Sequence, residues 1–532
     1  MADFLNDYVL SPTLSISSFA LTSIPVLRRW FFGKEDGSDV NLPPVCHFGT
    51  TVTKIRKHGV WGRHIIDQEL ANEIGHVYCM IPPPAMGGGL VKLVVNVSAP
   101  NLVEEVLTNT ATFPTRGKTG LGDTVGLGLV ELPTGERHSF HREIIGSMLT
   151  HTHLIQYAET VRAETNVLLS KWKVAAAEKI VINAHYDLTM CTQEIIGQIG
   201  LGQSNIGGGQ QVLEKDNTNY VETAFMMRRA AISTAVGKTV LKMFSSTKDN
   251  EQEASIRKNG YAETVEHVRV ALASSNPNMV KSMKNANDDG ESFTNQEIID
   301  EFITIRGAGH ETTSNTLSWC VMLLAKHTAV QDALYEEIQS VLGDRSTPSF
   351  ADTEHLILTK SVIYEALRMY PTVPSFPRLS VADTKLGEYD IPSGTLVFVS
   401  QSAMNRRKDI WGDDADVFNP SRFRRKGYSL DLVQSLPKGV PGGELYGFAP
   451  FGAGKRTCPG QRLALVEMVI MLAGIISSFD IKLAVASIDE IVKNSDITLG
   501  PKLGLPIYCT QREGREEQTN TLKPHYGIDS KL

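Results

Sequence analysis

Cysteine is scarce in this sequence. Six cysteines are spread over 532 residues, and no two of them stand at Cys-x-x-Cys spacing. This pattern argues against a structural zinc site and against a disulfide framework, so we expect the folded part to occupy a reducing compartment. One cysteine can still have a special role, and its neighbours must show which. The six are Cys46, Cys79, Cys191, Cys320, Cys458 and Cys509.

The chain also lacks a surplus of positive charge. It holds 52 lysines and arginines against 59 aspartates and glutamates, a net charge of −7. Proteins that bind nucleic acid generally carry a basic surplus, so we expect no nucleic-acid partner. With 42% hydrophobic and 21% charged residues, the composition is that of a folded globular protein.

Long uncharged runs are rare. Residues 8–27 carry no charge and are about long enough to span a bilayer, although they include five serines, two threonines and two prolines. Arg28, Arg29 and Lys34 follow, which would leave the rest of the chain on the cytoplasmic side. We expect residues 1–40 to be a leader that attaches to a membrane; a disordered or surface-lying leader is the alternative. No later run looks long and apolar enough to span, and residues 513–532 resemble a polar tail.

Most of the remaining sequence has a helical pattern. Thr294 and Glu297 form a capping box, and apolar and small residues continue to about Lys326, which predicts a helix of about 32 residues. A second helix is expected to end near Gly343 and a third just before Pro371, which cannot continue it.

A few segments have the pattern of strands. Val77–Met80, Lys92–Val97 and Thr395–Ser400 are rich in β-branched residues and lie far apart in the chain. The polar stretch Ser274–Ser292 predicts a surface loop. We therefore expect a mainly α-helical fold with a small β-sheet region built from distant segments.

The segment Phe451–Gly460, FGAGKRTCPG, carries the clearest chemical signal. Two glycines precede Cys458, and a helix is expected to follow with Pro459 at its first position, where a missing N–H costs nothing. The free N–H groups and the dipole of a helix N-terminus stabilise a thiolate. A buried cysteine in a glycine-rich turn would be the ordinary alternative.

This segment matches the FxxGxRxCxG pattern of the cytochrome P450 family, which the chain resembles from about residue 55 to residue 512. Stretches 101–107 and 113–116 also look like the family. The resemblance implies the cytochrome P450 fold over residues 41–512, with a long central helix over a heme. It implies Cys458 as the thiolate ligand of the iron, with Phe451, Gly454 and Arg456 around the cofactor.

Ala308–Thr313, AGHETT, lies within the long expected helix and resembles the oxygen pocket of the family. The resemblance implies that Gly309, beside Ala308, leaves room for dioxygen. Thr312 offers a hydroxyl and Glu311 a carboxylate, a pair that can relay protons. A hydrogen bond from Thr312 back to its own helix is the alternative.

Glu365 and Arg368 form an ExxR motif, whose spacing places both charges on one helix face. An exposed ion pair of small value is the alternative. In the family this pair is buried and structural, and Arg422 matches its third member. Ser421 stands where the family usually has glutamate, so this loop lacks one carboxylate.

Four further side chains match positions that hold heme propionates in the family. They are Arg378, Arg456 of the cysteine motif, and Arg142 and His138 of the segment HSFHR, in which His138 replaces the usual tryptophan. Arginine suits this task because its planar fork binds carboxylates with two hydrogen bonds. Each of these arginines alone could be a plain surface residue. Arg306 within the long helix is expected to pack or pair at the helix flank; contact with an acidic substrate is the alternative.

The resemblance implies a heme-dependent monooxygenase that inserts one oxygen atom of O2 into a small lipophilic substrate. It implies heme b, electrons from NADPH through a separate flavoprotein reductase, and attachment to the endoplasmic reticulum membrane with a cytoplasmic catalytic domain. The expected pocket is mostly apolar, which does not separate fatty acids, sterols, terpenoids and xenobiotics.

Two other functions remain open from the sequence. A heme-thiolate isomerase or dehydratase that consumes hydroperoxides would need no proton delivery, so Glu311 and Thr312 argue against it. A non-catalytic heme-binding protein would not need the oxygen pocket. Dependence of turnover on NADPH and a reductase would separate a monooxygenase from both.

Overall fold

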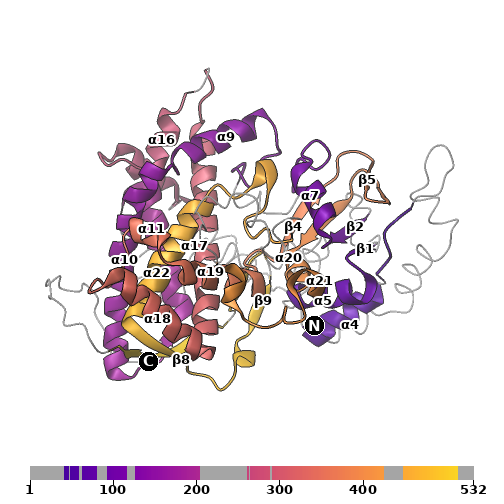
Figure 1. Ribbon diagram of the computed structural model, residues 1–532. Coiled ribbons are helices and arrows are strands. Elements are labelled where there is room, and N and C mark those ends of the chain that lie inside the picture. Colours follow the sequence, from indigo (N-terminus) through magenta and orange to yellow (C-terminus); the bar gives the residue numbers. More distant parts are fainter. Residues whose placement is uncertain are drawn as a thin grey trace, which may run out of the picture.

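Figure 1 shows the computed structural model of the chain. It describes residues 41–46, 48–58, 63–80, 93–116, 126–203, 261–262, 264–287, 290–424, 447–495, 497–501 and 503–512. The leader 1–40 and the tail 513–532 lie outside the described residues.

Helices dominate the fold, as the sequence predicts. They are α4 (Phe48–His58), α5 (Arg63–Ile74), α7 (Pro100–Thr108), α9 (Glu136–Ser147), α10 (His151–Glu178), α11 (Ala184–Leu201), α16 (Met279–Asn285), α17 (Asn295–Lys326), α18 (Thr328–Leu342), α19 (Ile357–Met369), α20 (Gln401–Met404), α21 (Lys408–Trp411) and α22 (Gln461–Ser478). Four short 3-10 turns are η2 (Ala351–Glu354), η3 (Pro420–Phe423), η4 (Gly454–Arg456) and η5 (Ile488–Glu490).

The strands form four small sheets in the described part of the chain. They are β1 (Val77–Met80), β2 (Val94–Val97), β3 (Ile182–Asn183), β4 (Ser375–Leu379), β5 (Thr384–Leu386), β6 (Tyr389–Ile391), β7 (Leu396–Ser400), β8 (Phe479–Leu483), β9 (Lys493–Ser495), β10 (Leu499–Pro501) and β11 (Pro506–Gln511). The largest sheet has the order β1-β2-β7-β4, in which β2 and β7 are parallel. It therefore joins segments some 300 residues apart, as expected from the sequence.

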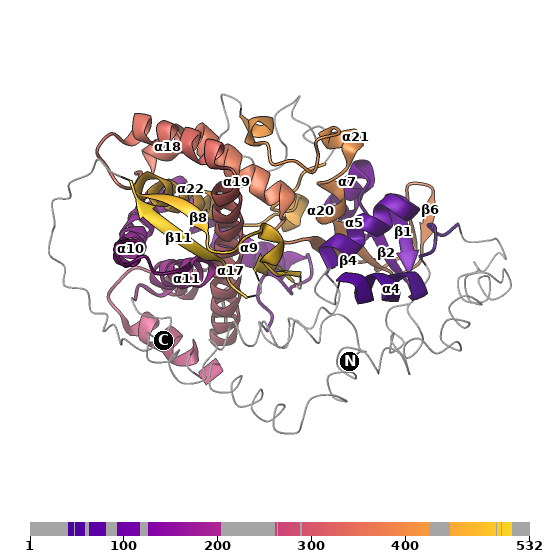
Figure 2. The ribbon, with the colours of Figure 1, turned by 90° about the horizontal axis from the view of Figure 1, so that it is seen from below.

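The long helix α17 confirms the prediction at both ends. The Thr294 side chain accepts from the Glu297 backbone N–H and the Glu297 side chain accepts in return, a complete capping box. The helix runs to Lys326 over 32 residues and packs against α11, α19 and α22. It crosses the helical body, to which α10 and α18 also belong (Figure 1). The largest sheet, with α4 and α5, lies to one side of that body (Figure 2).

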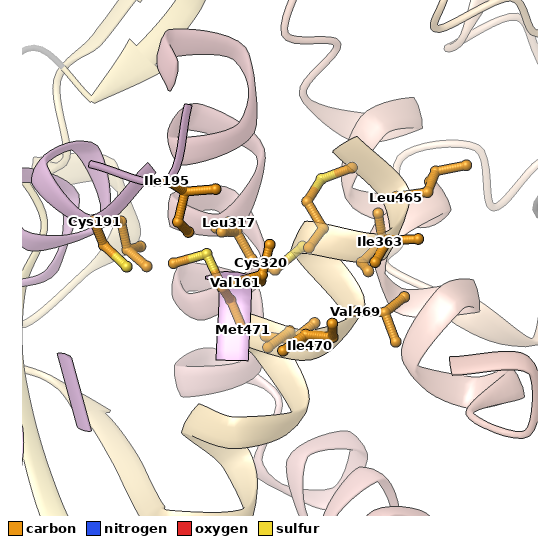
Figure 3. Packing of buried hydrophobic residues seen from close by; sticks show 14 of the residues in the cluster. Val161, Cys191, Ile195, Leu317, Cys320, Ile363, Leu465, Val469, Ile470 and Met471 are labelled. Carbon is orange, nitrogen blue, oxygen red and sulfur yellow. The ribbon is translucent and has the colours of Figure 1, made fainter. Parts of the chain in front are cut away.

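Helix α22, which follows the cysteine motif, forms the centre of the core. Apolar side chains occur around its whole circumference, with Glu467 as a buried exception, as expected for a helix surrounded by protein. Leu465, Val469 and Met471 meet side chains of α10, α11, α17 and α19 (Figure 3). The expectation that no later run could span a membrane is wrong, because Gln461–Ser478 is long and apolar enough to do so. This helix is however 89% buried inside the fold, which identifies it as a core helix.

The stretch Ser274–Ser292 contains a helix where a surface loop is expected. Residues Met279–Asn285 form α16, and the Asn278 side chain accepts from the Lys281 backbone N–H to cap it. Met279, Val280 and Met283 are buried. Three apolar residues on one face are enough to dock the turn on the core, and the polar composition of the stretch hides them.

Candidate active site

Cys458 stands at the end of a tight turn. Gly452 and Gly454 adopt left-handed φ values of 72° and 68°, which favour glycine. A Cβ atom on Gly454 would lie 2.7 Å from the Leu107 carbonyl oxygen of α7, so only glycine permits this approach. The Cys458 N–H donates to the Phe451 carbonyl at 2.9 Å, which closes the turn. Phe451 itself is partly buried against the main core.

The helix after Cys458 begins later than the sequence predicts. Helix α22 starts at Gln461, and Pro459 and Gly460 form the turn before it. Backbone N–H groups of Gly460 and Gln461 nevertheless hydrogen-bond the Cys458 sulfur. Proline at 459 therefore removes a backbone N–H from the turn before α22 and not from the first turn of the helix.

The Cys458 thiol differs from the other cysteines. All six lie in the described residues and none is in a disulfide, but five are buried and Cys458 alone is exposed. Surrounding protein raises the pKa of the Cys458 thiol, although the Gly460 N–H and the nearby Arg142 and Arg116 pull it down. A bound metal ion would remove this penalty because it stabilises the thiolate directly.

Buried arginines gather near this thiol. Burial lowers the pKa of Arg378 and of Arg456 to about 9, and each is lowered further by Arg116. Burial likewise lowers the pKa of Arg116. Among the described residues, the carboxylate that offsets these charges is Glu131, acting on Arg116 and Arg456. Two buried cations and a partly buried third with a single acid are costly unless an anion joins them.

The individual contacts of these arginines differ. Arg456 donates to the Leu132 and Val130 carbonyls at 2.6 and 2.9 Å, and its Nε has no hydrogen-bond partner among the described residues. Arg378 donates to its neighbour's carbonyl, that of Pro377, at 2.9 Å. The buried Nε of Arg116 likewise has no hydrogen-bond partner within the described part of the chain. Arg116 ends the stretch 113–116 noted above but was not predicted as a site residue, because a lone arginine in a loop carries no signal of burial.

Helix α9 brings two more predicted residues to this region. Arg142 Nη1 donates to the Thr457 carbonyl at 2.6 Å, which ties α9 to the residue before the cysteine. His138 is 3% exposed, and burial with the charges of Arg456 and Arg142 lowers its pKa to about 4. His138 is therefore neutral at pH 7 and can donate one hydrogen bond.

The AGHETT segment lies in the middle of α17 without interrupting the helix. Ala308 is exposed and Thr312 half-buried, whereas most side chains of this helix are buried. Thr312 Oγ1 donates to the Ala308 carbonyl at 2.8 Å, the helix back-bond considered as the alternative. A Cβ on Gly309 would lie 2.8 Å from Ile196 Cγ1 of α11, so this glycine also permits close packing of α17 on α11.

One charged residue of α17 lies within this segment and another lies just before it. Glu311 accepts a hydrogen bond from Thr498 Oγ1 at 2.6 Å. Arg306 is 5% exposed, so its side chain is buried; packing or pairing at the helix flank stays a prediction.

The ExxR residues form a buried charged cluster. Arg368 donates through Nε and Nη2 to the two Glu365 oxygens at 2.7 and 2.8 Å, and both side chains are fully buried. Arg422 Nε lies 3.5 Å from Glu365 Oε1 and its Nη2 pairs with Asp414 at 2.6 Å. The structure therefore brings the three predicted residues together, and Asp414 adds a carboxylate to a loop that has serine at 421.

These residues fit a heme. An exposed thiol, N–H groups directed at its sulfur and buried arginines in need of an anion match an iron-bound porphyrin with two propionates. The site thus defines the class of heme-thiolate proteins.

Comparisons with known proteins agree with this class. The sequence model of the family described as Cytochrome P450 matches residues 62–507, and the chain belongs to this family. A cytokinin hydroxylase of Arabidopsis thaliana is 26% identical over 430 residues, 76% of each chain. Secologanin synthase 1 of Catharanthus roseus is 27% identical over 73% of this chain and 74% of the relative. Pentalenene oxygenase of Streptomyces avermitilis is 27% identical over 76% of this chain and 88% of the relative.

Membership confirms the predicted fold class and reaction. The protein is a heme-dependent monooxygenase that transfers one oxygen atom of O2 to an organic substrate. It uses heme b, with electrons from NADPH delivered by a separate reductase.

Proposed function

We propose that heme b lies between the Cys458 turn and the exposed Ala308 of α17, with Cys458 as the iron ligand. The observation that carries this proposal is the exposed thiol beside a cluster of arginines that outnumber Glu131, the described carboxylate that offsets them. When bound, the heme supplies O2 activation, and a thiolate ligand favours cleavage of the O–O bond.

The surrounding residues seat the group. Arg378, Arg456 and Arg142, together with neutral His138, bind the propionates, and Arg116 joins them because its charge acts on Arg378 and Arg456 in the same cluster. Gly454 keeps the turn close to α7, and Phe451 holds it against the core. The Glu365, Arg368 and Arg422 cluster fixes the loops behind the turn and does not touch the substrate.

Two side chains of α17 bring protons to the site where O2 reacts. The Thr312 hydroxyl is the donor next to the reacting oxygen, and the Glu311 carboxylate gains and loses the proton that passes. Gly309 leaves room for O2 beside Ala308. Turning Thr312 Oγ1 from the Ala308 carbonyl toward the pocket requires only one side-chain rotation.

The substrate is a small lipophilic molecule. Ile305 and Ala308 share one face of α17 with Thr312, so apolar side chains stand next to the hydroxyl there. The relatives named above act as a cytokinin hydroxylase, a secologanin synthase and a pentalenene oxygenase, and this range suits a pocket shaped by apolar contacts.

The catalytic domain spans residues 41–512 and faces the cytoplasm at the endoplasmic reticulum membrane. The leader 1–40 anchors it through the uncharged stretch 8–27, and residues 513–532 are a polar tail. A membrane-bound flavoprotein reductase meets it there. Among the described residues, the helix long and apolar enough to span a membrane is α22, and its burial in the core supports an anchor elsewhere, as proposed for the leader.

Heme retention tests the proposed seat. Arg378→Leu should release heme about tenfold faster to an apo-globin acceptor, because a hydrogen bond to a charged group contributes roughly 1.5–3 kcal/mol. Arg345→Leu is the matched control, since Arg345 is 48% exposed and pairs with Asp352 elsewhere. Equal rates of heme loss from the two variants would show that Arg378 does not help to bind the heme.

A further inference from the structure

One face of α17 is bonded to the hairpin formed by β9 and β10. Glu311, Asn315 and Trp319 are spaced four residues apart, so they line up along the helix. The Thr498 hydroxyl donates to Glu311 Oε1 at 2.6 Å, and Asn315 Nδ2 donates to the Thr498 hydroxyl at 3.3 Å. Trp319 Nε1 donates to the Leu499 carbonyl at 3.0 Å.

These contacts fix the direction of the Thr498 hydroxyl. A hydroxyl has a single proton, and because the Asn315 N–H occupies a lone pair of its oxygen, the proton is directed to Glu311. Asn315 is 2% exposed and Thr498 is 5% exposed. Any Cβ on Gly500 would clash with the Asn315 amide, so glycine at 500 allows Asn315 to stay in place.

The hairpin does not depend on the Thr498 side chain for its position. The Leu499 N–H donates to the Thr372 carbonyl at 2.8 Å, and the Thr372 and Thr316 hydroxyls are 2.7 Å apart. With the Trp319 bond, the backbone next to Thr498 is held at two points. A substitution that removes only the Thr498 hydroxyl therefore leaves the hairpin where it is.

We propose that Thr498 is a positioning residue. It holds the Glu311 carboxylate in the orientation from which the carboxylate can pass protons to the site where O2 reacts. The inference rests on the proposed role of Glu311. It also links proton delivery to the β9–β10 hairpin, which bears Thr498 and is distant from α17 in the sequence. A substrate that shifts this hairpin would change the orientation of the acid.

Thr498→Val tests the proposal because it keeps the shape and removes the hydroxyl. With NADPH, reductase and O2, the variant should release several-fold more hydrogen peroxide per NADPH, since O2 then takes two electrons and two protons without transfer of oxygen. Thr498→Ser should restore coupling. Thr192→Val is the control, because it removes a buried hydroxyl that bonds the His310 carbonyl of α17 and not Glu311.

A second readout needs no turnover. In the ferric protein without substrate, the infrared carboxyl band that Glu311→Gln abolishes should titrate about one pH unit higher in Thr498→Val. The shift is upward because the ionised carboxylate has lost a donor, and one unit is a tenfold change in the ionisation equilibrium. Thr498→Ser should titrate as the unsubstituted protein does.

The outcomes separate the two proposals. If Glu311→Gln raises peroxide release but Thr498→Val changes neither peroxide nor the infrared titration, the positioning role is wrong and the role of Glu311 stands. If Glu311→Gln itself leaves peroxide release unchanged, the proposed role of Glu311 fails. Thr498→Ala repeats the test if Thr498→Val does not fold.

Discussion

Arg368 shows how a fully buried charge is accommodated in this fold. Its guanidinium donates to both Glu365 oxygens, to the Asn405 and Ala415 carbonyls at 2.9 and 2.6 Å, and to the Val417 carbonyl at 3.3 Å. Every nitrogen therefore has a partner, which is the condition under which a buried ion pair is tolerated. The carbonyls come from the segment that leads to Arg422, so the pair organises a loop as well as a helix.

Removing one partner of this pair should be costly. Glu365→Gln leaves Arg368 charged and buried without its counter-ion, and we expect the free energy of unfolding to fall by about 3–5 kcal/mol. Glu159→Gln is the control, because Glu159 is 62% exposed in its pair with Arg162 and should change stability by less than about 1 kcal/mol. Denaturant unfolding of both variants measures the difference. Similar midpoints would mean that the ExxR cluster does not stabilise the fold.

Site residues within local motifs could be predicted from the sequence, and those defined by long-range contacts could not. Cys458 and Glu311 belong to motifs whose spacing carries their chemistry. Arg116 is recognisable only when Arg378 and Arg456 are brought beside it, since its burial and its charged neighbours have no local signal. Thr498 contacts an acid 187 positions away, which no pattern in its own segment indicates.

At the scale of elements, the sequence signals for helix ends were reliable where the signal residues cap or block backbone hydrogen bonds. The capping box placed the start of α17, and α19 ends at Met369, two residues before Pro371. Pro459 gave a start two residues early for α22, since proline also suits the turn before a helix. The polar context around α16 concealed its buried face, because composition averages over residues that point in opposite directions.

The leader is the element with the most direct cellular test. Full-length protein should sediment with membranes, and a variant that lacks residues 1–40 should move largely to the soluble fraction, since its uncharged stretch is lost. The truncated protein should still bind heme, because the site residues all lie beyond residue 40. Immunoblotting of the fractions measures the shift. An unchanged distribution would mean that the leader is not the anchor.

At the scale of the whole molecule, the site lies where three parts of the chain meet. The cysteine turn rests on α7 beside the sheet, α17 crosses the helical body, and α9 connects to the turn through Arg142 (Figure 1). Core helix α22 fixes the position of the turn because it follows directly and is held by α10, α17, α18 and α19. Figure 3 shows part of this packing. Oxygen chemistry thus depends on the relative position of elements that are distant in sequence.

The bond between the Cys458 sulfur and the heme iron is the claim on which the whole account depends. The carbon monoxide difference spectrum of the reduced protein tests it most directly, because a thiolate ligand gives a red-shifted Soret band. We predict that the unsubstituted protein and Cys320→Ser, which alters a buried cysteine, both show this band and that Cys458→Ser loses it. A Cys458→Ser protein that keeps the band, or an unsubstituted protein that lacks it after heme is supplied, would contradict the account.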